Sequence, residues 1–328
     1  MPKKDQLVPV FIPSLAECLA HAEKLKGSLL TETEVVRIRD KAVCMMMSSE
    51  RARDMGDERG YRDVHPETCW SDWHRLRVQM TGNGYLPKIV LCLLGGPDFP
   101  EQCATIFKED GIEHEHEFQG PDERMVRAFE VSASPVHPSL TKQDYAQIEA
   151  HTSVLYVLSK NFTAGDAPQV SREFLRLGSR LLQGGAIAMK CESSGIAHGQ
   201  QRWIALAEKT KQDFTQECWS ALFAAYVQMP LQSEEEDLHT CGMHLLGKPD
   251  LIVQNAILPV SDAIELFQGF AMYLLGECKQ GEFGSGHTFH LNKSSPRFRV
   301  VWEACSGYEE DEFFFNPFGR WRFTKMQR

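Results

Sequence analysis

The sequence predicts a mixed α+β protein, in which a helical N-terminal extension precedes a larger domain of alternating strands and helices. Apolar side chains recur at helical spacing within residues 1–87, whereas the continuous and strictly alternating runs that mark strands begin at residue 88. Apolar residues make up 42% and charged residues 24% of the 328 residues, a balance typical of folded globular proteins. We therefore divide the chain into an extension, 1–87, and an α+β domain, 88–328.

The extension is expected to contain three helices. Residues 14–26, SLAECLAHAEKLK, place apolar side chains three and four positions apart. Thr31 and Glu34 form a capping-box pattern at the start of a second helix that runs to about Met47. The segment 69–80, CWSDWHRLRVQM, predicts a third helix after a polar loop.

The first half of the domain, 88–160, is expected to form a ferredoxin-like unit with the order β-α-β-β-α-β. KIVLCLL at 88–94 is continuously apolar and predicts a central, buried strand. IEHEHEFQ at 112–119 alternates strictly and predicts a strand at or near an edge of the sheet. MVRAFEVSAS at 125–134 and TSVLYVLS at 152–159 are interpreted as the other two strands. The two helices of the unit are predicted at 99–111 and 139–151.

The second half, 161–328, continues as a second α+β half. Amphipathic helices are expected at 170–182 and 259–277, and a buried strand at 184–191. The aromatic segment 217–230, ECWSALFAAYVQMP, favours a strand. Short strands near the end are predicted at 286–292, 298–305 and 318–323.

The composition argues against several classes of function. A formal net charge of −10 is unfavourable for general binding to nucleic acid, which needs clustered Lys and Arg. No segment approaches the roughly 20 apolar residues that span a membrane, and Pro9 and Pro13 break the start too early for a signal peptide. The ten cysteines include no C-x-x-C pair, so we expect a cytoplasmic protein in which Cys44, Cys92 and Cys191 are buried free thiols.

Residues 239–251, HTCGMHLLGKPDL, hold two histidines and a cysteine, which suggests a metal site or a phosphate loop. On a strand His239 and Cys241 share one face and His244 takes the other, so the three side chains do not converge on one ion. A phosphate loop needs G-x-x-x-x-G-K-[ST], and Pro249 lacks an amide that such a loop would use. We predict two antiparallel strands joined by a turn near Pro249, with polar residues at the edge of the sheet and no metal bound.

His114 and His116 form the sharpest alternative metal site. They would project from the same face of one strand, and histidines at i and i+2 bind zinc when a third ligand arrives. The sequence shows no third ligand, and the same alternation is typical of a charged edge strand. We therefore predict neither a metal nor a cofactor, keep His114 and His116 as the metal candidates, and assign no catalytic residue.

The loop RGYRDVHPETCW, 59–70, gathers several residue types that are common in binding sites. Tyr61, Asp63, His65 and Trp70 are our candidates for a ligand cleft, because loops often carry function. The other interpretation, which we favour, is a structured linker held in place by its tyrosine and tryptophan.

Five ordered segments are similar to a known pattern: KIVLCLLGGP, HTSVLYVLS, GGAIAMKCESSGIAH, TCGMHLLGKPDL and PVSDAIELFQGFAMYLL. From residue 88 to about residue 323 the chain resembles a bacterial family catalogued only as a domain of unknown function. The most recognisable segment is TCGMHLLGKPDL, which resembles the family's hairpin of glycine, apolar residue, glycine, any residue, proline and acid; His239 and His244 are not part of the pattern. The resemblance implies that 1–87 is an addition outside the family domain, and it brings no activity and no site residues.

Two functions remain open from the sequence. The first is a non-catalytic binding or regulatory protein, for example an immunity-type or stress-related factor, with an unknown protein or small molecule as its partner. The second is a metal-dependent hydrolase built on His114 and His116, together with Cys103, or on Asp63 and His65.

Overall fold

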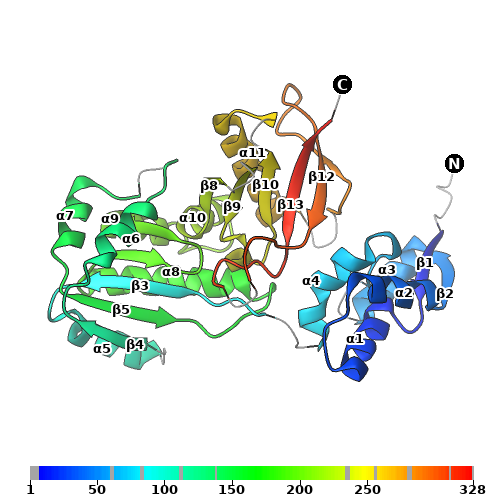
Figure 1. Ribbon diagram of the computed structural model, residues 1–328, viewed down its shortest axis with the longest axis horizontal. Coiled ribbons are helices and arrows are strands. Elements are labelled where there is room, and N and C mark those ends of the chain that lie inside the picture. Colours follow the sequence, from blue (N-terminus) through cyan, green and yellow to red (C-terminus); the bar gives the residue numbers. More distant parts are fainter. Residues whose placement is uncertain are drawn as a thin grey trace. The chain divides into compact units, whose positions relative to one another are not determined.

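The computed structural model contains two compact units, Met1–Tyr85 and Leu86–Arg328, and we describe each by itself (Figure 1). The sequence patterns alone placed the boundary between residues 87 and 88. The residues that the structure describes are 7–59, 63–81, 85–110, 114–136, 139–232, 237–254, 257–278, 283–309 and 312–326.

The described residues of the N-terminal unit form four α-helices beside a two-stranded antiparallel ribbon. Its elements are β1 (Leu7–Phe11), α1 (Leu15–Lys26), α2 (Glu32–Lys41), β2 (Cys44–Ser48), α3 (Ser49–Arg59), the short 3-10 helix η1 (Pro66–Thr68) and α4 (Cys69–Thr81). The predicted capping box of Thr31 and Glu34 at the start of α2 is confirmed. Leu15, Leu19 and Trp73 are fully buried and form the centre of the core of this unit.

The second helix ends earlier than expected. It stops at Lys41, and the run CMMM forms strand β2, which pairs with β1 in the register Phe11 with Cys44. Pairing with a distant strand outweighs the local helical spacing, because alternate residues of β2 exchange backbone hydrogen bonds with β1. Our prediction that Cys44 is buried is therefore wrong, since its side chain is exposed on the ribbon.

In the larger unit a five-stranded sheet comes first along the chain. Its strands are β3 (Val90–Gly95), β4 (His114–Gln119), β5 (Ser153–Leu158), β6 (Ala186–Cys191) and β7 (Ile196–Gly199). They stand in the order β4-β5-β3-β6-β7, and all four pairings are antiparallel. The predictions that the first strand is central and the second lies at an edge are confirmed.

One strand expected in this region is a helix instead. Residues 125–134 were predicted as a strand, but α6 (Arg124–Val131) occupies most of the segment and α7 (Lys142–Glu149) follows. Met125 and Phe129, four residues apart, both bury their side chains, and this spacing suits one face of a helix. The described residues of 88–160 thus contain three strands, where we had expected four.

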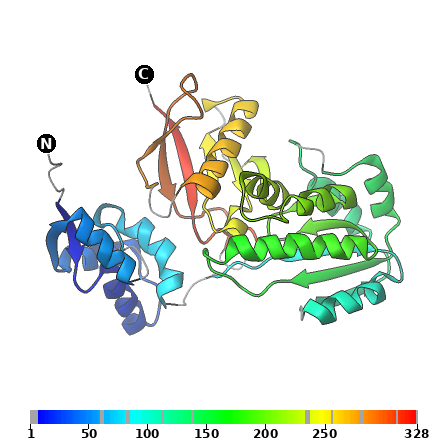
Figure 2. The same cartoon turned by 180° about the vertical axis from the view of Figure 1, so that it is seen from behind.

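Helices cover both faces of the five-stranded sheet. Leu91 and Leu93 of β3 face the core that contains α5 (Phe99–Asp110) and α8 (Ala167–Gln183), whereas Cys92 and Leu94 face α6 and α7. Figure 2 shows α8 lying across the sheet. The chain then forms α9 (Gln200–Glu208) and α10 (Gln216–Tyr226), so the strand favoured for 217–230 is mostly helix.

The rest of the larger unit is built on a six-stranded sheet. Its strands are β8 (Gln228–Gln232), β9 (Asp237–Cys241), β10 (Asp250–Gln254), β11 (Thr288–Phe289), β12 (Phe298–Glu303) and β13 (Arg320–Lys325). The order is β11-β12-β13-β10-β9-β8, in which only the β10–β13 pairing is parallel. The strands predicted near 286–292, 298–305 and 318–323 are confirmed.

Helix α11 (Val260–Met272) covers the six-stranded sheet and continues into the π-helical turn η4 (Tyr273–Glu277). Its Phe270 meets Phe323 of β13 edge-on, with ring centroids 5.0 Å apart. One apolar core runs through both halves of the larger unit, from β3 and α8 to α11 and β13. The architecture therefore mixes helices and sheets, as the α+β class requires. Among the helices of the described chain, none has the length and apolar character needed to cross a membrane.

Candidate functional site

The stretch HTCGMHLLGKPDL connects β9 to β10, and these strands are antiparallel as predicted, with His239 opposite Ile252. The link between them is longer than the expected turn, because residues 243–246 form the 3-10 helix η2 (Met243–Leu246). Gly242 and Gly247 flank η2 with φ angles of 115° and 69°. A side chain on Gly242 would collide with the carbonyl oxygen of Tyr226, so only glycine fits this position.

Asp250, the acid that ends the GKPD turn, is fully buried and accepts three hydrogen bonds. Thr240 Oγ1 donates to Oδ1 at 2.8 Å, the Met243 amide donates to the same oxygen at 3.2 Å, and Asn316 Nδ2 donates to Oδ2 at 2.6 Å. Burial nevertheless raises the pKa of this carboxyl to about 6. Asp250 therefore serves as a buried structural link between β9, η2, β10 and the segment before β13.

The two histidines of this stretch occupy different environments. His244 is buried, and burial lowers its pKa to about 3, whereas His239 is only partly buried. The expectation that these polar residues lie at the edge of the sheet is wrong for His244, because η2 turns its side chain into the interior. Within the described ranges, no group of three or more His, Cys, Asp or Glu side chains could hold a metal ion.

The other metal candidates, His114 and His116, lie on the edge strand β4 opposite Val157 and Leu155 of β5. Their side chains lie outside the described part of the structure. The backbone register alone places both residues on the same face of β4.

The loop candidates for a ligand cleft take part in local structure of the N-terminal unit. Asp63 caps α1, since its Oδ2 accepts the Leu15 amide and its Oδ1 the Ala16 amide, both at 2.9 Å. His65 Nδ1 accepts the Glu67 amide at 3.3 Å at the start of η1. Trp70 contacts the ring of His74 edge-on at 4.3 Å. Tyr61 lies outside the described residues.

A pocket of about 850 Å³ opens in the larger unit, beside the start of α9. It is lined by residues of α9, α10 and β8, by residues of α11 and η4, and by the segment 289–292. Ligand pockets commonly enclose about 300–1,000 Å³ and combine apolar walls with a few polar groups. This one fits the description, because buried Phe223, Val227 and Met229 line it together with His198 and Arg202.

His198 is the most unusual polar group of the pocket. Its side chain is buried, and Nε2 lies 3.1 Å from the carbonyl oxygen of Ala225, so Nε2–H is the donor of that bond. Nδ1 is then a hydrogen-bond acceptor, and it is buried with no partner among the described atoms. Burial, supported by the nearby charge of Arg202, lowers the pKa of His198 to about 4, so the ring is neutral near pH 7.

Arg202, three residues into α9, is half-buried on the same lining. Its Nε is buried and has no hydrogen-bond partner in the described chain. Glu265, Glu277 and His290 also line the pocket, but their side chains are exposed to solvent. The pocket lining thus combines an acceptor at His198, a cation at Arg202 whose Nε has no partner in the described chain, and the exposed carboxylates of Glu265 and Glu277.

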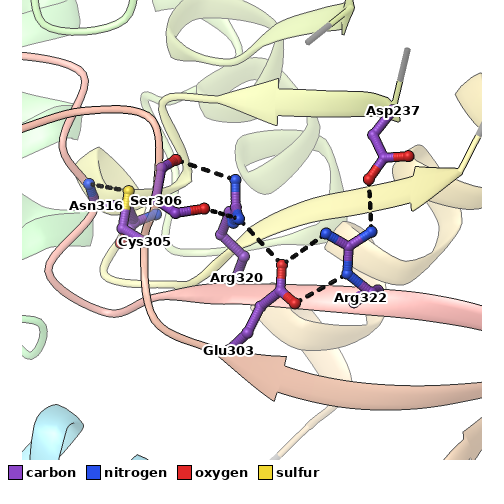
Figure 3. Close-up of polar contacts among 7 residues, drawn as sticks. All are labelled: Asp237, Glu303, Cys305, Ser306, Asn316, Arg320 and Arg322. Atoms are coloured by element: carbon purple, nitrogen blue, oxygen red, sulfur yellow. Dashed lines mark hydrogen bonds and ion pairs between the residues drawn. The ribbon is translucent and has the colours of Figure 1, made fainter. Parts of the chain in front are cut away.

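Two arginines of β13 have carboxylate partners. In Figure 3, Arg322 of β13 donates to Glu303 of β12 at 2.9 and 3.0 Å and to Asp237 of β9 at 2.6 Å. These hydrogen bonds raise the pKa of Arg322, and those to Glu303 have the largest effect. Arg320 lies 3.1 Å from the same Glu303 and also donates to Ser306. Neutralised pairs of this kind hold strands together, whereas Arg202 has no carboxylate partner within the described chain.

Sequence reasoning missed His198 and Arg202. The segment that contains them, GIAHGQQRW, begins within GGAIAMKCESSGIAH, and none of the predicted sites lies there. The one local signal is a histidine just before Gly199, the residue that precedes α9. Part of the pocket lining comes from residues more than 60 positions further along the chain, such as Glu265 and His290, and no local sequence pattern indicates that these residues lie close to His198 and Arg202.

Comparisons of the chain with known protein families, with curated proteins and with solved structures found no match. The resemblance of residues 88–323 to a bacterial domain family therefore stays a prediction.

Proposed function

We propose that the protein is a non-catalytic binding protein that holds a small organic molecule in the pocket beside α9. The observation that carries the proposal is His198, a residue of the pocket lining whose Nδ1 is buried without a partner among the described atoms. A buried polar atom left without a hydrogen bond costs about 1–3 kcal/mol, and a ligand that donates to it removes this cost.

The apolar lining supports the same proposal. Phe223 and Val227 of the α10 segment, Met229 of β8 and Met272 of α11 present hydrocarbon and thioether surface to the pocket. Burying the apolar part of a ligand against such surface contributes about 25 cal/mol for each Å² removed from water. Because α9, α10 and α11 all contribute lining residues, an occupant would connect α9 and α10 with α11.

We also propose a ferredoxin-like arrangement, shifted relative to the predicted span of 88–160. The proposed unit is β3-α5-β4-β5-α8-β6, with α6 and α7 inserted between its second and third strands. The antiparallel order β4-β5-β3-β6 and the shared core of α5 and α8 on one face support it. A reducing compartment such as the cytoplasm is the proposed location, and ten free thiols support it.

A thermal-shift screen tests the proposed function. A library of neutral, anionic and cationic fragments is scored for compounds that raise the Tm of the intact chain. Each hit is repeated on Ala224→Phe, which fills the pocket from α10, and on Ala205→Phe, which adds the same ring to the exposed side of α9. Compounds that raise the Tm of the unaltered protein should no longer raise it in Ala224→Phe, and they should still raise it in Ala205→Phe.

Two outcomes would reject the binding pocket. Either no fragment raises the Tm of the unaltered protein, or hits act equally on both variants. The unliganded Tm of each variant is measured first. If Ala224→Phe does not fold, Ser220→Phe, also on the α10 side of the lining, replaces it.

A further inference from the structure

We infer that the pocket takes an organic monoanion: a carboxylic acid with a neutral hydrogen-bond donor on the adjacent carbon and an apolar side chain, that is, an apolar 2-hydroxy acid. The carboxylate would pair with Arg202, and the hydroxyl would donate to Nδ1 of His198. This inference rests on the proposed function and names the ligand class of the same pocket.

The anionic group of the proposed ligand is inferred from Arg202. A half-buried guanidinium without a carboxylate partner in the described chain lacks the compensation that Arg322 receives from Glu303 and Asp237. A carboxylate matches the planar fork of arginine and can accept two parallel hydrogen bonds from it. An anion that enters the pocket thus supplies the missing partner.

The other residues of the pocket lining indicate that the ligand carries a single negative charge. Arg202 is the only Lys or Arg among the described lining residues, and Glu265 and Glu277 add negative charge near the opening. A phosphate monoester would bring about two negative charges to one cation and meet repulsion from both glutamates. A monoanionic carboxylate avoids this imbalance. The two exposed glutamates are solvated, so they weaken the binding of a monoanion only slightly.

The neutral donor follows from His198. Its Nε2–H is engaged by the Ala225 carbonyl, which leaves Nδ1 as an acceptor for a hydroxyl or amine hydrogen. His198 lies two residues before the start of α9 and Arg202 lies in the first turn of that helix, and the guanidinium is close enough to lower the pKa of the imidazole. The donor of the ligand therefore lies near its carboxylate. A hydroxyl suits this position better than an ammonium, which would place a second cation beside Arg202.

Isothermal titration with four probes on one carbon skeleton tests the inference. The probes are 2-hydroxy-3-phenylpropionate, 3-phenylpropionate, 2-hydroxy-3-phenylpropionamide and phenylalanine. The hydroxy acid is expected to bind about fivefold more tightly than the acid without the hydroxyl, the effect of one hydrogen bond. It is expected to bind at least about tenfold more tightly than the amide, which lacks the charge, and more tightly than phenylalanine.

Three variants assign each contact to its residue. In Arg202→Gln the tenfold advantage of the hydroxy acid over the amide disappears, and Arg202→Lys restores part of it. In His198→Phe, which keeps an aromatic ring beside Trp203, the fivefold effect of the hydroxyl disappears while the preference for the acid remains. Arg127→Gln, at an exposed ion pair on α6, is the matched control and leaves all four affinities unchanged.

Several results would overturn the inference. They are equal binding of the amide and the hydroxy acid, tighter binding of phenylalanine, unchanged affinities in Arg202→Gln, or no binding of any probe. If fragments from the thermal-shift screen still bind and are blocked by Ala224→Phe, only the ligand class is wrong. If no fragment binds, the proposed function fails as well.

Discussion

Asn316 donates from Nδ2 to Oδ2 of Asp250 at 2.6 Å, although the two residues are 66 positions apart in the chain. The same amide nitrogen donates to the Lys248 carbonyl at 3.1 Å, and the Asn316 side-chain oxygen accepts the Phe318 amide at 2.9 Å. The acid of the GKPD turn is thus tied to the segment that leads into β13, next to β10 in the sheet. This link gives Asp250 a role that its sequence pattern did not reveal.

Replacing Asp250 with Asn should change how stability depends on pH. Burial raises the pKa of this carboxyl from its usual value near 4 to about 6, so the folded state binds a proton that the unfolded state has lost. Stability from this group is fully present below pH 4 and is lost as the pH rises through 6. The free energy of unfolding of the unaltered protein minus that of Asp250→Asn should rise by up to about 3 kcal/mol from pH 7.5 to pH 4.

Urea unfolding at several pH values measures this difference. Asp40→Asn, which also removes one carboxylate but at an exposed ion pair with Arg39, serves as the control for a surface substitution. A flat curve for Asp250→Asn would show that the buried carboxyl has an ordinary pKa.

His244 and His239 should differ sharply in their contribution to stability. His244 is buried in η2, so His244→Ala leaves a cavity and should lower the free energy of unfolding by about 3 kcal/mol. His239 is only partly buried on β9, and His239→Ala should cost about 1 kcal/mol. Chemical denaturation of the two variants gives both values. Equal losses would mean that burial does not separate the two histidines.

Asp63→Ala should weaken the start of α1. The change removes the acceptors of the Leu15 and Ala16 amides and should destabilise the N-terminal unit by about 2 kcal/mol. The rate of amide hydrogen exchange in α1 measures this loss of stability directly, and we expect faster exchange in the variant. Asp40→Ala, whose carboxylate is exposed, should leave exchange in α1 unchanged. Unchanged exchange in Asp63→Ala would show that the cap is not formed.

Thiol labelling should separate Cys44 from the buried cysteines. Cys44 is exposed on β2, whereas Cys92 and Cys191 are fully buried, and burial raises the pKa of each to about 12. A thiol reagent should modify Cys44 first under native conditions, because the thiolate is the reacting form. The Cys44→Ser variant should lack this fast phase. Rapid modification of Cys92 would contradict the central position of β3.

Much of the fold was predictable where one strand carries its own signal. The apolar run at 88–94 indicated a central strand, and the alternating run at 112–119 indicated an edge strand, because each pattern reflects how many faces of a strand are covered. The strand prediction for 125–134 was wrong because the apolar residues of this segment fit both the period of a strand and the period of a helix. Only packing decides between the two. Strand β2 was not predicted, because the strand with which it pairs, β1, is distant in sequence.

The candidate site was not predictable from local patterns. His198 and Arg202 become notable only when burial removes their contact with water and no protein group in the described chain replaces it. The lining from α11 and η4 reaches them through the packing of two sheets into one core. A single sequence records neither burial nor the absence of a partner.

The most direct test of the binding pocket is NMR of protein labelled with ¹³C at the methionine methyl groups. Met229 and Met272 line the pocket, whereas Met45 and Met46 are exposed on the ribbon of the other unit. Titration with 2-hydroxy-3-phenylpropionate, and with any compound that raises the Tm, should shift the methyl signals of Met229 and Met272 to saturation. The signals of Met45 and Met46 should stay in place. Compounds that bind the protein but leave Met229 and Met272 unmoved would contradict the pocket as the ligand site.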